Sequence, residues 1–392
     1  MKVIVAGGSL GGLFAGIVAK SQGHSVHILE RHTSARVRGS GAGIVLGKSI
    51  REFLSRFSPN HQLETVTSDG HFFLDRAGTI IRTIEKHQET TSWDQLYLIA
   101  RETFDGGEVE SKYLEGHTVT KADVRIEDDK IEVSYTDADR ILKREEVDLL
   151  LGADGAFSAL RRSLLEDVAP SYAGYVAWRG IVVEDEIAPT IFDLCLNKLV
   201  FYNSPGCQMV VYVVPGEEGK RYVNWVWYCD SEENSLPSPE LMTGNDGSVH
   251  RVTLQAGQVR PEVWDSQKNF AQEVLPPQFY EIVQSTHRPF VQAIWDVISP
   301  QNFFHEGKVI LIGDALAGLR PHTGAGTEQA AFHSLILENL LNESASPEEF
   351  IRLTMEHSQY IQSIGVQIGE KIGLGARRED NAFRTDRQAQ LF

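Results

Sequence analysis

Glycines and one carboxylate near the amino terminus are spaced for binding a pyrophosphate. Residues 7–12 read GGSLGG, between a short apolar run and a helical stretch. Gly7 permits a tight turn and Gly12 permits close packing of helix on strand, so the start of the helix faces the phosphates. Glu30 ends the next apolar run, where an acidic side chain binds ribose hydroxyls. A plain glycine turn would leave Glu30 without a role, although the pattern does not separate FAD from NAD. The predicted contacts are Gly7, Ser9, Leu10, Gly12, Glu30 and Arg31.

Two later segments also place a carboxylate at the end of an apolar run. Residues 152–158 read GADGAFS and lead to Arg161; Asp154 either faces a ligand or caps the following helix. Residues 313–326 read GDALAGLRPHTGAG, and Asp314 is placed to accept hydrogen bonds from a ribitol or ribose. A glycine-rich loop that opens a helix can direct N–H groups at the edge of an electron-rich ring.

The elements that must position these residues change in kind along the chain. Apolar runs at 2–6 and 309–312, each followed by a turn and a helical stretch, predict a Rossmann-like unit. Beyond residue 165 the pattern turns to alternating β. We predict an α/β fold in which a Rossmann-like dinucleotide-binding domain, an FAD-binding domain by the family resemblance that follows, interlocks with a mainly antiparallel β substrate domain and ends in helices. The predicted parts are 1–165 for FAD binding, 166–295 for the β substrate domain, and 296–392 for the return to the first domain and the final helices.

Composition limits the partners. The 392 residues carry a net charge of −17, which disfavours nucleic acid and anionic membrane surfaces. The three cysteines have no metal or CxxC spacing and the histidines form no cluster, so we expect no metal and a cytoplasmic location. Residues 3–19 are apolar, but their glycines fit a strand, turn and helix better than a secretory signal.

The glycine turn, the GADG segment and the GDA segment together resemble the FAD-dependent aromatic hydroxylases, flavoprotein monooxygenases of the para-hydroxybenzoate hydroxylase type. The stretches GAGIV at 41–45 and YAGYVAWRG at 172–180 resemble the 2,6-dihydroxypyridine hydroxylase branch. One departure from the family pattern is Glu328, which would bring a negative charge beside the flavin. The further flavin contacts that the resemblance implies are Gly43, Asp154, Arg161, Gly313, Asp314, Pro321, Gly324 and Gly326.

The resemblance also implies a reaction. NADPH or NADH reduces the FAD, the reduced flavin reacts with O₂, and an electron-rich ring attacks the resulting C4a-hydroperoxide. The expected substrate is a small hydroxypyridine, phenol or hydroxybenzoate, with decarboxylation as a variant, and a homodimer is one option for the assembly. Two alternatives stay open: an FAD-dependent reductase or dehydrogenase, and a non-catalytic protein that keeps the fold.

Candidate catalytic residues lie in the flavin loop and the β region. His322 follows the loop proline and titrates near neutral pH, so it could accept a phenolic proton; alternatively it is a structural loop residue. Arg179 could pair with a substrate carboxylate or belong to an ordinary ion pair. Most aromatic residues of the β region must be core. The remaining candidates for substrate contact are Tyr175, Tyr212 and Trp225.

Overall fold

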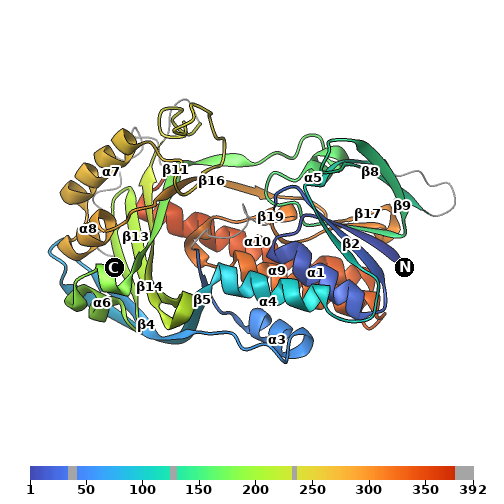
Figure 1. Cartoon of the computed structure of the whole chain (residues 1–392), viewed down its shortest axis with the longest axis horizontal. Helices are drawn as coiled ribbons and strands as arrows, with labels where there is room; N and C mark the ends of the chain where they lie inside the picture. Colours follow the sequence, from blue (N-terminus) through green and yellow to red (C-terminus); the bar gives the residue numbers. More distant parts are fainter. Residues whose placement is uncertain (34–41, 124–129, 232–235, 376–392) are drawn as a thin grey trace.

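The computed structural model of the chain describes residues 1–33, 42–123, 130–231 and 236–375, so Gly41 lies outside the described part. A smaller, mostly parallel sheet lies at the amino-terminal end of the long axis and a larger sheet lies at the other end (Figure 1). Strands β11 (Ser171–Val183) and β16 (Phe290–Ile298) pair with each other and run between the two ends.

The smaller sheet is the predicted Rossmann-like unit. Its central strand β1 pairs in parallel with β10 on one side and β2 on the other, and all of β1 beyond Lys2 is buried. Burial on both faces is typical of parallel strands and explains why these runs are so apolar. In spatial order the strands are β17 (Phe303–Phe304), β18 (Val309–Leu311), β10 (Leu149–Gly152), β1 (Lys2–Ala6), β2 (Ser25–Glu30) and β6 (Lys112–Glu115).

Helices cover one face of this sheet and a small antiparallel sheet covers the other. The helical layer packs through side chains such as Phe14, Phe53 and Leu96. The helices are α1 (Leu10–Ser21), α3 (Lys48–Phe57), α4 (Trp93–Asp105) and α9 (Gly326–Leu341). The opposite layer consists of β7 (Thr118–Asp123), β8 (Ile131–Thr136), β9 (Leu142–Val147) and α5 (Ala159–Leu164).

The larger sheet is mainly antiparallel, and its two faces differ. One face packs under three helices through Trp178, Trp225 and Trp227, and the other faces the centre of the molecule. The covering helices are α6 (Pro189–Cys195), α7 (Pro261–Val274) and α8 (Pro277–Gln284). The remaining strands are β15 (Thr253–Leu254), β14 (Arg221–Asp230), β13 (Cys207–Pro215), β12 (Leu199–Ser204), β4 (Val66–Leu74), β5 (Ile80–Ser92) and β3 (Gly43–Val45), with β19 (Ala317–Gly318) pairing with β16 off the main path.

The two sheets share the chain in an interlocked way. Residues 43–92, predicted as part of the FAD-binding domain, contribute β3, β4 and β5 to the larger sheet, so the predicted first domain supplies strands to both sheets. The chain returns to the smaller sheet through β18 and continues as α9 and α10 (Pro347–Ile372). The predicted fold class is therefore confirmed. Within the described residues, no helix is long and apolar enough to cross a membrane.

Candidate functional site

The amino-terminal glycine turn has the geometry expected of a phosphate-binding turn. Gly7 has a left-handed φ of 98°, which only glycine adopts without strain. A Cβ on Gly12 would lie 1.8 Å from the carbonyl oxygen of Gly7, so the helix approaches the turn too closely for any side chain. Ser9 is exposed at the start of α1 and its side chain caps no N–H group there. The first turn of α1, which begins at the buried Leu10, is therefore open to an anion.

Glu30 organises this turn from the end of β2. One carboxylate oxygen accepts a hydrogen bond from the Gly8 N–H at 2.7 Å, and the other accepts one from the His32 N–H at 2.8 Å. The Tyr113 hydroxyl donates to the carbonyl oxygen of Gly8 at 2.8 Å. The side chain of Arg31 is exposed and donates to His32, so it does not reach the turn. A direct bond from Glu30 or Arg31 to a ribose stays a prediction.

Asp154 caps a helix, which is the alternative that the sequence left open. Its Oδ2 accepts from the N–H groups of Ala159 at 2.7 Å and Leu160 at 3.2 Å, at the start of α5. Its Oδ1 is buried and has no partner among the described residues. The cap therefore uses one oxygen and leaves the other for a further donor.

Arg161 joins the GADG segment to the GDA segment. Its guanidinium is buried and donates to the carbonyl oxygen of Ala315 at 2.7 Å and to that of Ala156. These bonds fix the relative position of two turns that are far apart in the sequence. A contact between Arg161 and the flavin stays a prediction, since the hydrogen bonds of its buried guanidinium go to the protein's own carbonyl groups.

The GDA turn presents Asp314 to a cavity. Gly313 has a left-handed φ of 54°, and its N–H donates to Nδ1 of the buried His333 at 3.0 Å. The side chain of Asp314 is exposed to the space inside the cavity. Protein atoms nevertheless surround the carboxyl on many sides, and this burial raises its pKa to about 6. No described residue donates a hydrogen bond to it. Its environment therefore suits the hydroxyl groups of a ligand.

Glu328 does not place its charge beside the cavity, unlike the expectation from the family pattern. Its two oxygens accept hydrogen bonds from the N–H groups of Ser49 at 2.7 Å and Ile50 at 3.1 Å, at the start of α3. A Cβ on Gly47 would lie 2.2 Å from this carboxylate. Glu328 thus caps α3 from the neighbouring helix α9.

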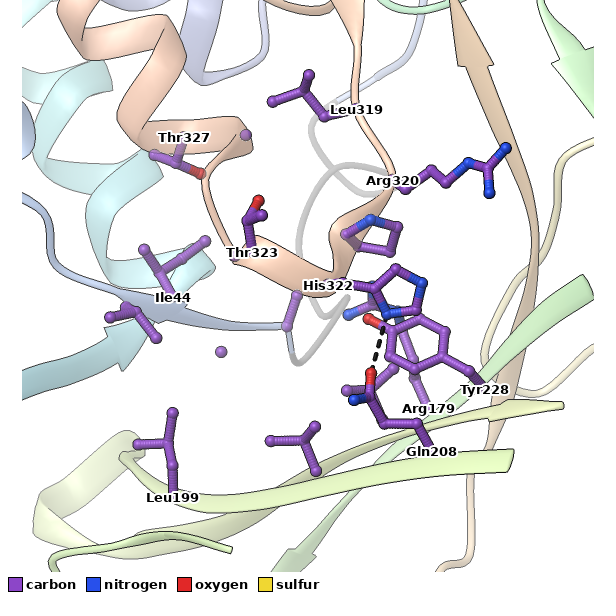
Figure 2. Close-up of a pocket in the computed structure, with 18 of the residues that line it drawn as sticks. Ile44, Arg179, Leu199, Gln208, Tyr228, Leu319, Arg320, His322, Thr323 and Thr327 are labelled. Atoms are coloured by element: carbon purple, nitrogen blue, oxygen red, sulfur yellow. Dashed lines mark hydrogen bonds between the residues drawn. The ribbon is translucent and has the colours of Figure 1, made fainter. Parts of the chain in front are cut away.

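The cavity of about 330 Å³ lies between the larger sheet and the loop of residues 319–327. Pro321, Gly324 and Gly326 line it from the loop, where Gly324 has a left-handed φ of 65°. Its volume is in the range of small-molecule sites. Figure 2 shows one end of the cavity formed by His322, Gln208, Tyr228 and Arg179, and the other side formed by Ile44 and Leu199.

His322 lines this cavity as predicted, but both of its ring nitrogens are engaged. Nδ1 donates to Oε1 of Gln208 at 2.9 Å, and Nε2 accepts from the Tyr175 hydroxyl at 2.8 Å. The ring also lies 4.6 Å from that of Tyr228. Burial, together with the positive charge of Arg320, lowers the pKa of His322 to about 3. A neutral imidazole with both nitrogens bonded is a poor proton acceptor, so the geometry favours the structural reading of His322.

The register of the strands decides which of the other predicted aromatic residues face the cavity. Tyr212 lines the cavity on β13, and Tyr175 lies behind His322. Trp225 is outside the cavity: it is fully buried on the opposite face, where its indole donates to Thr286 at 3.0 Å. The physical reason is alternation, because successive residues of β14 point to opposite faces and Tyr228 takes the cavity side. The structure therefore removes Trp225 from the candidate substrate contacts.

Three polar residues of the site were missing from the predicted contacts. Gln208 and Asn224 share the cavity face of β13 and β14, and Asn224 accepts from the N–H of Gly43 at 3.1 Å. A Cβ on Gly43 would lie 2.4 Å from the Tyr212 ring, so this glycine lets the loop rest on the tyrosine. His333 was missing too. Gln208 and Asn224 could have been found in the sequence, because each is a polar residue on an otherwise apolar strand. Such residues mark the face of the sheet that does not pack in the main hydrophobic core.

The described residues fit FAD. The first turn of α1, which no side chain caps, is open to a pyrophosphate, Asp314 lacks a donor, and the loop glycines line a cavity that could accept a flat ring. Glu30 ends β2 and Asp154 follows the end of β10, the two strands that flank β1, so both lie at the edge where parallel α/β sheets bind nucleotides. Among the described side chains no group of His, Cys, Asp and Glu residues could hold a metal ion.

Comparison with known proteins agrees with this reading. A family model described as FAD binding domain-like matches residues 172–296. The 2,6-dihydroxypyridine 3-monooxygenase of Paenarthrobacter nicotinovorans is 28% identical over 84% of this chain and 80% of its own length. The 6-hydroxynicotinate 3-monooxygenase of Pseudomonas fluorescens is 25% identical over 87% of this chain and 83% of its own length.

Solved structures show the same fold. The 2,6-dihydroxypyridine-3-hydroxylase from Arthrobacter nicotinovorans has a TM-score of 0.84 at 23% identity, covering 96% of this chain and 93% of that chain. A salicylate hydroxylase in a substrate complex has a TM-score of 0.73 at 17% identity, covering 99% of this chain and 93% of that chain. These likenesses confirm the predicted resemblance to the FAD-dependent aromatic hydroxylases.

Proposed function

We propose that this chain, which has the fold of the FAD-dependent aromatic hydroxylases, is an FAD- and NAD(P)H-dependent monooxygenase that hydroxylates an electron-rich aromatic ring. The observation that carries the proposal is one cavity with two chemically different walls. Asp314 and the glycine loop form the wall that fits a flavin, and Arg179, Gln208 and Tyr228 form a polar wall on the sheet opposite. The relatives with the names given above support a ring of the hydroxypyridine, phenol or hydroxybenzoate class.

The bound FAD supplies the redox chemistry, taking electrons from NADPH or NADH and passing them to O₂. The protein has to hold the ring and keep water away from it. Leu199, Val210 and Val226 supply apolar surface at the cavity wall. Gln208 and His322 are fixed by their mutual hydrogen bond, so they present a rigid polar edge. His322 acts in this proposal as a positioning residue, because neither of its nitrogens is free to take a proton.

Two other functions are possible on this fold, a reductase or dehydrogenase and a non-catalytic binding protein. A reductase or dehydrogenase on this fold would oxidise NAD(P)H without oxygenating a ring. A non-catalytic protein would have no use for Asp314, a carboxylate that lines the cavity and receives no hydrogen bond from the described residues. The relatives named above are oxygenases, which favours the enzyme over both. A cytoplasmic location and a homodimer remain predictions.

The test is a reconstitution. Purified protein loaded with FAD is mixed with NADH or NADPH and a panel of 2,6-dihydroxypyridine, 6-hydroxynicotinate, salicylate and 3-hydroxybenzoate. NAD(P)H loss, hydrogen peroxide and product mass are followed together. We expect a product heavier by one oxygen atom, or the corresponding decarboxylated phenol, with little peroxide. Asp314→Ala, prepared in parallel, is the control that should retain less FAD. NAD(P)H oxidation that yields only peroxide with every ring would contradict the proposal.

A further inference from the structure

Two of the three cysteines face each other across neighbouring strands of the larger sheet. Cys207 begins β13, and the strand register sets it directly opposite Cys229 of β14. Both side chains lie on the helix-covered face of the sheet, where they are 6% and 7% exposed. The third cysteine, Cys195, is fully buried at the end of α6, outside the strands of the sheet. The fold therefore makes a pair of Cys207 and Cys229 and leaves Cys195 apart.

The pair occupies the type of position that brings two cross-strand side chains closest together. Where β13 turns into β14, the N–H of Gly216 donates to the carbonyl oxygen of Lys220 at 2.8 Å, so these two residues form a hydrogen-bonded pair. Hydrogen-bonded and non-hydrogen-bonded pairs alternate along an antiparallel ladder, and Cys207 lies nine positions before Gly216. The pair of Cys207 with Cys229 is therefore non-hydrogen-bonded. The Cα atoms of such a pair lie about 4.5 Å apart, within the range of about 4.4–6.8 Å that a disulfide spans.

The two thiols have different surroundings. Burial raises the pKa of Cys207 to about 11, although hydrogen bonds from Trp227 and Ser204 oppose the rise. The indole Nε1 of Trp227 donates to Sγ of Cys207 at 3.1 Å. Burial, and then the neighbouring Cys207, raise the pKa of Cys229 further. Cys207 is therefore the more acidic thiol and the one that attacks an oxidant first. Both thiols are protonated at neutral pH, so they react slowly and resist brief exposure to an oxidant.

The next pair along the same two strands belongs to the cavity wall. Gln208 and Tyr228 lie directly opposite each other, point to the other face of the sheet and line the cavity. Oε1 of Gln208 accepts the hydrogen bond of His322. A disulfide most often holds its Cα atoms about 5.5–6 Å apart, so closing the bridge would move β13 and β14 apart by about 1 Å next to Gln208 and Tyr228. A change on the helix-covered face is thus transmitted to the polar wall of the cavity.

We propose that Cys207 and Cys229 are an oxidative modification site: hydrogen peroxide converts them into a reversible disulfide, and this bond weakens the binding of a ring in the cavity. The sulfur of Cys207 attacks one peroxide oxygen, the O–O bond breaks, and the thiol proton leaves with the second oxygen as water. The sulfur of Cys229 then attacks the resulting sulfenic acid, the S–O bond breaks, and its own proton completes a second water. The two thiols lose two electrons and two protons, and the peroxide is reduced to two waters.

The inference rests on the proposed function only for the source of the peroxide. A flavin oxygenase that oxidises NAD(P)H without a suitable ring releases hydrogen peroxide as a side product. The disulfide would then record unproductive turnover in the same molecule. A spacing at the short end of the disulfide range strains the bond, and strained disulfides are the ones that a dithiol reduces readily.

The test treats FAD-loaded protein with hydrogen peroxide and counts the free thiols after denaturation. The parent should fall from three thiols to one, lose the mass of two hydrogen atoms, and yield two peptides joined through Cys207 and Cys229. Dithiothreitol should restore all three thiols. The dissociation constant of 2,6-dihydroxypyridine, followed through the flavin absorption spectrum, should rise by about 3- to 10-fold on oxidation and return to the starting value on reduction.

Three variants control the experiment. Cys195→Ser is the matched control, because it removes a buried thiol outside the pair; it should fall from two thiols to none and show the same loss of ring affinity. Cys207→Ser and Cys229→Ser each remove one member of the pair, so neither should form a disulfide, and peroxide should leave their ring affinity unchanged. FAD content and the urea unfolding midpoint are measured on each preparation. If a serine variant fails to fold, the peptide map of the oxidised parent decides the question alone.

The outcomes separate this inference from the proposed function. Parent protein that keeps all three thiols in peroxide, or loses Cys195 as fast as the pair, would overturn the inference even if it hydroxylates a ring. A disulfide between Cys207 and Cys229 that leaves the ring affinity unchanged would overturn the link to the cavity. A reversible disulfide that lowers ring affinity, in a protein that oxygenates no ring, would support the inference and contradict the proposed function.

Discussion

Replacing His322 with Leu tests whether this residue is a base or a positioning residue. The substitution removes two hydrogen bonds and leaves the hydroxyl of the buried Tyr175 and Oε1 of the buried Gln208 without these partners. Each stranded buried group costs about 1–3 kcal/mol, so the free energy of unfolding should fall by about 2–6 kcal/mol. That is a large part of the total of about 5–15 kcal/mol for a typical protein.

The assay has two readouts on one preparation, urea unfolding of the FAD-loaded protein and the rate of ring hydroxylation per bound FAD between about pH 5 and pH 9. Because the pKa of His322 is about 3, the parent should show no rate change caused by this residue in that interval. Tyr175→Phe is the matched control, since it removes the Nε2 bond alone and should cost about 1–3 kcal/mol.

One pattern of results would refute this reasoning. It is a parent rate that rises through an ionisation near about pH 6.5, the ordinary value for histidine, combined with loss of that rise in His322→Leu and an unchanged free energy of unfolding. His322 would then be the base that its position in the flavin loop first suggested.

Three other predictions follow from the site. Glu328→Ala should lower the free energy of unfolding by about 1–2 kcal/mol in urea titrations, because α3 loses its cap, whereas Glu328→Gln should cost less. Arg161→Met leaves the carbonyl oxygens of Ala315 and Ala156 without their donor and should lower both the unfolding midpoint and the FAD content after gel filtration; full FAD retention would show that the two turns hold their places independently. Asp314→Asn should stabilise the FAD-free protein, as followed by thermal unfolding, by an amount that grows between about pH 4 and about pH 6, is full above about pH 6 and vanishes below about pH 3. The reason is that the folded pKa is raised to about 6, so at pH values between about 4 and 6 the carboxyl ionises in the unfolded state before it does so in the native state.

Much of the fold could be predicted because its signals are local. The glycine turn at residues 7–12 and the apolar run before Asp314 depend on close neighbours in the sequence, and the structure has them as expected. The contribution of residues 43–92 to the larger sheet could not be predicted, because β4 pairs with β12 across a long separation. A strand pattern shows that a partner exists without showing which strand it is.

The site was predicted less completely than the fold. His322 and Tyr212 were placed at the cavity from their segments, but the hydrogen bonds of His322 to Gln208 and Tyr175 come from three separate elements. Those bonds, and the burial that accompanies them, decide the protonation of the ring. The prediction that Trp225 contacts substrate was wrong because Tyr228, three residues further along β14, is equally aromatic. Only the register of β14 shows which of the two faces the cavity.

The bonds of Arg161 have a consequence for how the protein is made. Arg161 and Ala315 are 154 positions apart in the sequence, and β18 adds to the smaller sheet beside β10 only after every strand on the main path of the larger sheet has been synthesised. A nascent chain that has emerged from the ribosome as far as the GADG segment, but no further, therefore carries exposed strand edges and an incomplete nucleotide pocket. Cofactor capture must wait for the last quarter of translation, and truncated products of the gene should emerge colourless and prone to aggregate.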